Sequence, residues 1–196
     1  MELIKRRGAL IVVSAPSGAG KTTLCHEVRQ LVPDLFYSVS HTTRAPRPGE
    51  VNGTDFHFVT EAEFLEMRDR DAFAEWAAVH GHYYGTPKHP ALDLLEGGKD
   101  VLLEIDVQGA LQVRYQYPDA LMLFILPPNE RTLLQRLTDR GRDDPDDISK
   151  RFRAAKREIH MAKGSRAFDY MVFNDQLPRA VAEIQNIINN ERAGGI

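Results

Sequence analysis

The chain lacks the features of a disulfide-rich, zinc-rich or membrane-spanning protein. Cys25 is the only cysteine among 196 residues, which excludes an internal disulfide and a zinc site built from several cysteines. No apolar run approaches the roughly 20 residues of a transmembrane helix. The net charge of −3 gives no general attraction to nucleic acid, and no nucleic-acid-binding motif is present. We therefore expect a cytoplasmic monomer or homodimer that binds neither nucleic acid nor membrane.

Short apolar runs recur along the chain and alternate with segments of helical periodicity. The runs cover residues 10–13, 101–105, 121–126 and 170–173. Parallel strands that alternate with helices leave this pattern, because each crossover helix covers one face of the sheet. The composition, 42% hydrophobic and 27% charged, is that of a soluble globular domain. The sequence thus predicts an α/β fold with a mainly parallel sheet and helices on both faces.

Two helices of this core can be predicted from a capping residue or from apolar residues at helical spacing. Asn129 is expected to cap a helix that Gly141 ends. The residues expected to form the apolar stripe of that helix are Leu133, Leu134 and Leu137. The residues expected to be buried by the last helix are Val181, Ile184, Ile187 and Ile188.

Two regions interrupt the alternation of strands and helices. Residues 38–89 are aromatic and rich in turn residues, and residues 136–157 are highly charged. In the first region, Thr60 and Glu63 have the spacing of a capping box. We expect a small satellite core there, built from Phe73, Trp76 and Val79. The prediction is one domain with a core of residues 1–37, 90–135 and 158–196, an insertion of residues 38–89 and a helical lid of residues 136–157.

The most informative stretch follows the first apolar run and resembles a phosphate-binding loop. Glycines let backbone N–H groups surround phosphate oxygens, the following helix contributes its positive end, and Lys21 adds a full charge. Thr22 offers a hydroxyl to a Mg²⁺ ion held by the phosphates. Ala15 replaces the first glycine of the usual pattern, and the alternative is an ordinary tight turn. The residues predicted to bind ATP are Ala15, Pro16, Ser17, Gly18, Ala19, Gly20, Lys21, Thr22 and Thr23.

A second possible phosphate site lies in the insertion. Arg44 and Arg47 stand three residues apart in a loop that Pro46 and Pro48 stiffen. Guanidinium groups bind phosphate through two parallel hydrogen bonds, so this loop is suited to a second phosphate group. The alternative is that both arginines are solvated loop charges.

Together these motifs resemble those of guanylate kinases. The motifs, in order, are the phosphate loop, Ser40-x-x-x-Arg44-x-x-Arg47-x-Gly49-Glu50, Gly81-x-Tyr83-Tyr84-Gly85 and Ile105-Asp106-x-Gln108-Gly109. The resemblance extends from about residue 9 to residue 192. It implies a P-loop kinase that transfers the terminal phosphate of ATP to GMP or dGMP with Mg²⁺, a step of purine nucleotide metabolism.

The resemblance also implies roles for residues around GMP. Those carried over to the GMP phosphate are Ser40, Arg44, Arg47 and Tyr84, and those carried over to guanine are Glu75, Thr86 and Asp106. Guanine carries N–H donors that carboxylates accept and a carbonyl that a hydroxyl can donate to, whereas adenine reverses much of this pattern. Glu75 and Asp106 are therefore the expected determinants of base specificity.

Two positions in the predicted GMP site are less simple. Phe56 stands where the family usually has a tyrosine that donates to the GMP phosphate, and phenylalanine cannot make that bond. Glu104 shares a strand face with Asp106 because the two are two residues apart. Glu104 lies either near the acceptor or the waters of Mg²⁺, or it is a structural carboxylate paired with Arg44 or Lys21.

The charged region resembles the family's lid. The resemblance places Arg140 and Arg151 on the ATP phosphates, and with Lys21 and Arg44 these form the predicted catalytic set. The arginines expected to be surface charge are Arg142, Arg153 and Arg157. Asn174 falls where the family holds adenine, and its alternative role is to cap the last helix.

Two other functions remain open from the sequence. Another P-loop kinase of small molecules would share the loop and lid but would not need Glu75, Thr86 and Asp106 together. A guanylate kinase-like interaction domain keeps the fold as a protein-binding module. The retention of Lys21, Arg140 and Arg151 favours an enzyme. The seven histidines show no zinc-protease spacing and are assigned no chemistry.

Overall fold

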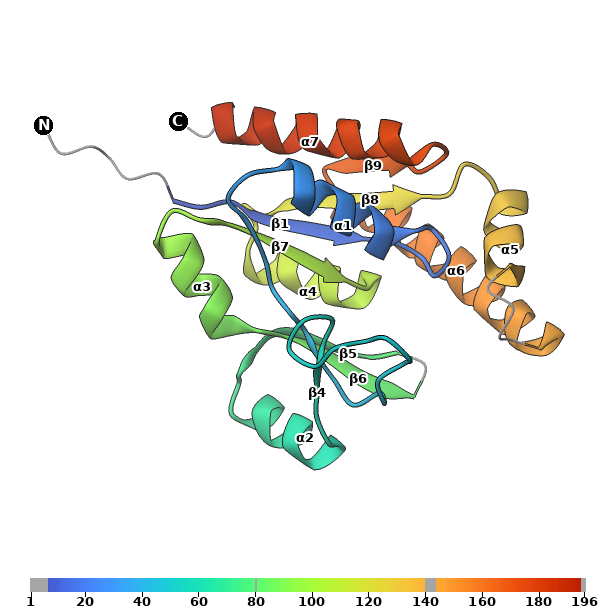
Figure 1. The fold of residues 1–196 in the computed structure, drawn as a ribbon, viewed down its shortest axis with the longest axis horizontal. Helices are drawn as coiled ribbons and strands as arrows, with labels where there is room; N and C mark the ends of the chain where they lie inside the picture. The colour runs from blue at the N-terminus through green and yellow to red at the C-terminus, as the bar shows by residue number, and fades with distance from the viewer. Residues whose placement is uncertain (1–6, 80, 140–143, 195–196) are drawn as a thin grey trace, which may run out of the picture.

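The computed structural model of the chain describes residues 7–79, 81–139 and 144–194. A parallel sheet lies at its centre, with strands in the order β2, β7, β1, β8, β9 (Figure 1). In that order the strands are Leu35–Tyr37, Asp100–Ile105, Leu10–Ser14, Leu121–Leu126 and Tyr170–Phe173. The four predicted strands are confirmed, whereas β2 was not predicted because three residues carry no clear periodicity.

Helices cover both faces of this sheet, as predicted. The helices on one face are α1 (Lys21–Leu31) and α7 (Leu177–Gly194), and those on the other include α3 (Lys88–Glu96) and α4 (Val107–Gln116). Side chains of a strand point alternately to its two faces. Val13 of β1 accordingly packs in a cluster with Ile184 of α7, and its neighbour Val12 packs with Leu95 of α3. The strand is fully buried because both faces are covered.

The predicted helix stripes are mostly confirmed. The residues of α7 predicted to be buried, Val181, Ile184, Ile187 and Ile188, are buried. Asn129 caps α5 (Glu130–Thr138) by accepting the N–H of Thr132 at 2.8 Å. The prediction for Leu134 was wrong, because this side chain is 42% exposed while Leu133 and Leu137 are buried. Leu133 and Leu137 lie one turn apart on one face, and Leu134 is rotated away from it. The predicted stop, Gly141, lies outside the described residues.

The insertion forms a second, smaller sheet below the first in Figure 1. Its strands, in the order β4, β3, β6, β5, are His57–Phe58, His41–Thr42, His82–Pro87 and Phe73–Val79. The sheet is mixed, since β3 pairs parallel with β4 and antiparallel with β6. Helix α2 (Glu61–Asp69) begins with the predicted capping box of Thr60 and Glu63.

The satellite core of the insertion differs in part from the prediction. Phe73 is 4% exposed and stacks on the fully buried Phe64, with ring centroids 4.6 Å apart. Trp76 is half-buried and lies edge-on to Tyr83. Val79, the last residue of β5, lines the cavity described below, and its place in this core stays a prediction.

Helix α6 (Pro145–Ser165) joins the charged region to the core. Near its start Phe152 packs with Leu133 of α5, and near its end Ala162 packs with Phe124 of β8. One continuous helix therefore crosses the predicted boundary between lid and core, and the division of the chain into core, insertion and lid stays a prediction. Among the helices of the described residues, none is long and apolar enough to cross a membrane.

Candidate active site

A cavity of about 290 Å³ opens where the phosphate loop, the insertion and the end of β7 meet. Its lining includes most of the predicted site: Ala15, Pro16, Ser17, Gly18, Gly20, Lys21, Thr22, Thr23, Ser40, Arg47, Phe56, Glu75, Tyr84, Glu104 and Asp106. Val79, Ile105 and Glu158 complete it. Residues from the ranges 15–23 and 104–106 thus line the same cavity, because β1 and β7 are neighbours and end at the same edge of the sheet.

The phosphate loop is held by contacts from the far edge of the sheet. Gly18 and Gly20 both have φ of 87°, a left-handed conformation that glycine adopts without strain. The Asn174 amide donates to the carbonyl of Ala19 at 2.8 Å, and a Cβ on Gly20 would lie 2.6 Å from the amide nitrogen of Asn174. Arg136 donates to the same Ala19 carbonyl at 3.3 Å. Asn174 is buried against the loop, and its predicted contact with adenine stays a prediction.

Lys21 and Thr22 begin α1 and reach the end of β7. The Lys21 ammonium donates to the carbonyl of Ile105 at 2.8 Å, and the Thr22 hydroxyl donates to Glu104 at 2.6 Å. Tyr37 donates to the other carboxylate oxygen of Glu104 at 3.3 Å. Glu104 thus accepts hydrogen bonds from Thr22 and Tyr37, and its place near the acceptor or the waters of Mg²⁺ stays a prediction. Burial, reinforced by Glu104, raises the pKa of Tyr37 and keeps it a neutral donor.

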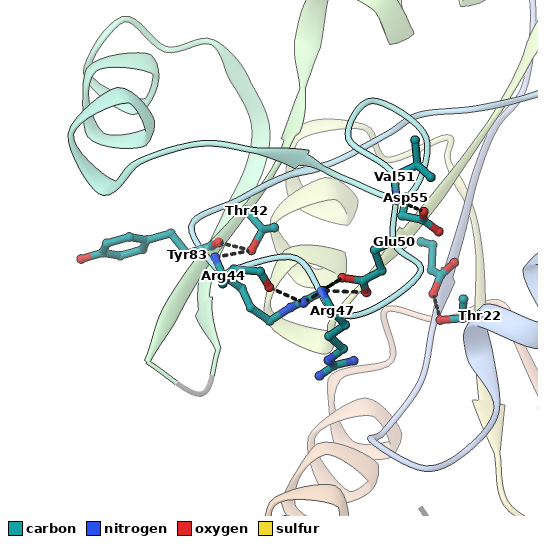
Figure 2. A network of polar contacts seen from close by, with 10 residues as sticks. Thr22, Thr42, Arg44, Arg47, Glu50, Val51, Asp55 and Tyr83 are labelled. Atoms are coloured by element: carbon teal, nitrogen blue, oxygen red, sulfur yellow. Dashed lines mark hydrogen bonds and ion pairs between the residues drawn. The ribbon is translucent and has the colours of Figure 1, made fainter. Parts of the chain in front are cut away.

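The arginine loop is organised by a carboxylate, as Figure 2 shows. Glu50 accepts two hydrogen bonds from the Arg44 guanidinium, at 3.0 and 2.9 Å, and one from the N–H of Arg47 at 2.7 Å. These bonds raise the pKa of Arg44 and lower that of Glu50. The Arg44 guanidinium also lies 5.4 Å from the ring centroid of Phe56, within cation–π range. The Arg47 side chain points away from this pair and lines the cavity.

The two carboxylates expected to bind guanine come from different parts of the fold. Glu75 of β5 is 4% exposed and accepts a hydrogen bond from the Thr86 hydroxyl at 2.5 Å, and Ser40 lies 3.3 Å from that hydroxyl. Burial raises the pKa of Glu75 to about 7, against the opposing effect of the Thr86 bond. Asp106 caps α4 by accepting the N–H of Gly109 at 2.9 Å. Thr86 itself is fully buried, behind Glu75.

Helix α6 brings a charged pair onto the phosphate loop. Arg151 donates to the Ser17 hydroxyl at 3.0 Å, and Glu158 accepts the backbone N–H of Ser17 at 3.2 Å. Burial raises the pKa of Glu158. Arg140, the other lid arginine of the prediction, lies outside the described residues. Arg151 and Ser17 are 134 positions apart along the chain, so tertiary packing alone brings α6 to the phosphate loop.

Three residues of the site were missed by the sequence reasoning. Glu50 belongs to a quoted motif, and an acid that follows two arginines closely in the sequence could have suggested its ion pair with Arg44. The only sequence signal for Arg136 was its position in a charged region, which predicts no particular partner. In the structure it donates to the carbonyls of Ala19 and Asn174. Glu158 gave no signal, because a carboxylate in a charged amphipathic helix reads as surface charge.

The comparisons with known proteins agree with this architecture. The sequence model of the family described as guanylate kinase matches residues 7–191. Guanylate kinases of Caldanaerobacter subterraneus subsp. tengcongensis and Geobacter sulfurreducens are each 47% identical over 189 residues, covering 96% of this chain and 90% and 92% of theirs. A crystal structure of guanylate kinase from Anaplasma phagocytophilum matches with a TM-score of 0.80 and 30% identity, over 96% of this chain and 88% of that one. The chain therefore belongs to the guanylate kinase family.

Proposed function

We propose that this guanylate kinase transfers the terminal phosphate of ATP to GMP, and also to dGMP, giving ADP and the corresponding diphosphate in the cytoplasm. One observation carries the assignment: a single cavity joins the phosphate loop to Arg47, Glu75 and Asp106. A donor phosphate on the loop and a guanine nucleotide on the insertion would meet in that hollow. Catalysis of phosphoryl transfer consists largely of such positioning and of charge stabilisation.

On the donor side, the ATP phosphates would lie against the backbone N–H groups of Gly18 and Gly20 and those at the start of α1. Lys21 supplies a positive charge at the end of the loop. Arg151 already contacts the loop at Ser17. From there its guanidinium would stabilise the negative charge that develops on the phosphates during transfer. Arg140 completes the proposed donor set on the strength of the family resemblance alone.

The residues at the start of α1 also fit a Mg²⁺ ion that arrives with ATP. Mg²⁺ prefers oxygen ligands and keeps several waters, so one hydroxyl and the phosphates suffice as partners. Thr22 would provide the hydroxyl, and Glu104, 2.6 Å from it, would accept hydrogen bonds from the water shell. Among the described residues, no group of three or more His, Cys, Asp or Glu side chains could hold a metal without a nucleotide. When bound, the ion would neutralise phosphate charge.

On the acceptor side, the GMP phosphate would be held by Ser40, Arg44, Arg47 and Tyr84. A guanidinium carries five N–H donors, so the bonds of Arg44 to Glu50 and Ala45 leave donors for a phosphate. Phe56 adds no hydroxyl, and its ring instead packs edge-on to Tyr84 and beneath the Arg44 guanidinium. These contacts orient the remaining phosphate ligands.

The base would be read by Glu75 and Asp106, which accept N–H donors of guanine, and by Thr86, whose hydroxyl would donate to the guanine carbonyl in place of Glu75. An adenine nucleotide offers no matching pair of donors, and leaving a buried carboxylate unpaired costs about 1–3 kcal/mol. Closure of the insertion and lid around both substrates would exclude water and so protect ATP from hydrolysis.

The direct test is a coupled assay of ADP release from ATP and Mg²⁺, with GMP, dGMP, AMP, CMP, UMP and dTMP in parallel as acceptors. We expect turnover with GMP and dGMP only. Turnover with another base would overturn the roles of Glu75 and Asp106, and no turnover with any acceptor would indicate an interaction domain instead of an enzyme.

The raised pKa of Glu75 predicts a pH-dependent KM for GMP. Below its pKa of about 7 the carboxyl group is protonated and loses acceptor capacity, so GMP binding weakens as the pH falls. Between pH 8 and pH 6 we expect the KM for GMP to rise by about tenfold from this group. The comparison is with Glu75→Gln, which cannot titrate. The phosphate of GMP, with a second pKa near 6, titrates in both proteins, so the difference between their profiles isolates Glu75. Parallel profiles would contradict the prediction.

A further inference from the structure

The recognition of guanine proposed above needs two carboxylates at a set separation, although one is on the insertion and the other on the core. Glu75 belongs to β5, and Asp106 caps α4. Strand β5 is at the edge of the insertion sheet, where it pairs with β6 on one side. The backbone groups of its other side need partners, and α4 packs against that strand.

Gln112 of α4 supplies one such partner. Its side-chain nitrogen donates to the carbonyl of Trp76 at 2.7 Å, and its side-chain oxygen accepts the N–H of Trp76 at 3.3 Å. A primary amide that bonds both groups of one residue takes the place of a peptide unit in a neighbouring strand. Trp76 directly follows Glu75, so this amide clamp fixes the strand beside the buried carboxylate.

Gly109 lies one turn before Gln112, on the same side of α4. A Cβ built on Gly109 would collide with Glu75 Oε2, would lie 2.8 Å from Glu75 Cδ and would lie 3.3 Å from Asp106 Oδ1. Its N–H meanwhile donates to Asp106. Glycine is a poor helix former, about 1 kcal/mol less favourable than alanine. Its presence inside α4 is explained by the space that Glu75 occupies.

We propose that Gln112 and Gly109 are positioning residues for base recognition: the Gln112 clamp ties β5 to α4, and the bare Cα of Gly109 lets Glu75 approach Asp106. Neither residue touches the base; both act through the two carboxylates, and this role rests on the proposed function. The geometry predicts that losing either feature weakens GMP binding and reduces selection for the exocyclic amine of guanine, while leaving the ATP site intact.

The test compares Gln112→Ala and Gly109→Ala with matched controls. Gln116→Ala changes an exposed residue one turn further along α4, and Gly164→Ala changes a helical glycine with nothing within 4 Å of the added Cβ. Binding of GMP and of inosine monophosphate, which lacks the amine, is measured by calorimetry without ATP, and KM and kcat are measured for both substrates. We expect Gln112→Ala and Gly109→Ala to bind GMP about tenfold more weakly than the wild type. The loss of affinity for inosine monophosphate should be smaller, and the KM for ATP should be unchanged.

Several outcomes would overturn the inference. Wild-type affinity for GMP in Gln112→Ala is one, and equal losses for GMP, inosine monophosphate and ATP together with a lowered Tm is another, since the residues would then be structural only. If Gly109→Ala fails to fold, Gln112→Ala decides alone. Glu75→Gln distinguishes the proposed function from the positioning role. If it weakens GMP binding while Gln112→Ala does not, Glu75 contacts the base and Gln112 is not a positioning residue. If Glu75→Gln has no effect on GMP binding, both the base contact of Glu75 and the positioning role are rejected.

Discussion

Replacing Lys21 with alanine is expected to lower kcat by about 10²- to 10³-fold, the loss typical of removing one group that stabilises transition-state charge. Lys21 is the proposed cation at the end of the phosphate loop, and its ammonium reaches the carbonyl of Ile105 across the cavity floor. Charge accumulates on the transferring phosphoryl group, so a fixed cation contributes more in the transition state than in the ground state. The measurement is steady-state kinetics with ATP and GMP both saturating.

Folding should survive this substitution. The variant loses one hydrogen bond to a backbone carbonyl, a cost of about 1 kcal/mol, while the packing of α1 through Leu24 and Val28 is untouched. Thermal unfolding should therefore show a small decrease in Tm. Lys163→Ala, which removes an exposed lysine from α6, is the matched control and should retain wild-type kcat. A Lys21→Ala enzyme with near-normal kcat would remove Lys21 from the catalytic set.

Replacing Arg151 with alanine is expected to lower kcat by about 10³-fold, the lower end of the effect of an arginine that stabilises the transferring phosphate. Its guanidinium already contacts the phosphate loop through the Ser17 hydroxyl, at 3.0 Å. A surface arginine contributes at most about 1 kcal/mol through its ion pairs, so the two roles differ measurably. Arg151→Lys keeps the charge but loses the planar fork, and we expect an intermediate kcat.

Arg153 provides the control on the same helix. It is exposed and donates to Ser149 one turn earlier, away from the loop. Arg153→Ala should therefore leave kcat and both KM values within about twofold of wild type, as surface substitutions usually do. Equal kinetics for Arg151→Ala and Arg153→Ala would show that Arg151 is a solvated charge without a catalytic role. Lys21 would then be the remaining proposed cation at the ATP phosphates.

Local patterns were enough to predict four strands of the parallel sheet and the starts of α2 and α5, but not the three-residue strand β2. The capping box at Thr60 and the cap at Asn129 depend on residues three positions apart, and their hydrogen bonds form as expected. The buried runs of the sheet were predicted because parallel strands covered on both faces are apolar throughout. Leu134 was placed in the core wrongly, since which of two adjacent leucines is buried depends on what lies beside the helix.

By itself, then, the sequence determined the α/β core, the phosphate loop and, through the family resemblance, the residues expected around ATP and GMP. The tertiary structure alone decided how those residues are held: Glu158 on the loop, Thr22 on Glu104, and Gln112 on the edge of β5. Each of these contacts joins residues 36 to 141 positions apart. Local propensity and periodicity do not predict contacts between residues so far apart in the sequence. Such contacts form only when the whole fold packs and closes the long loops between them.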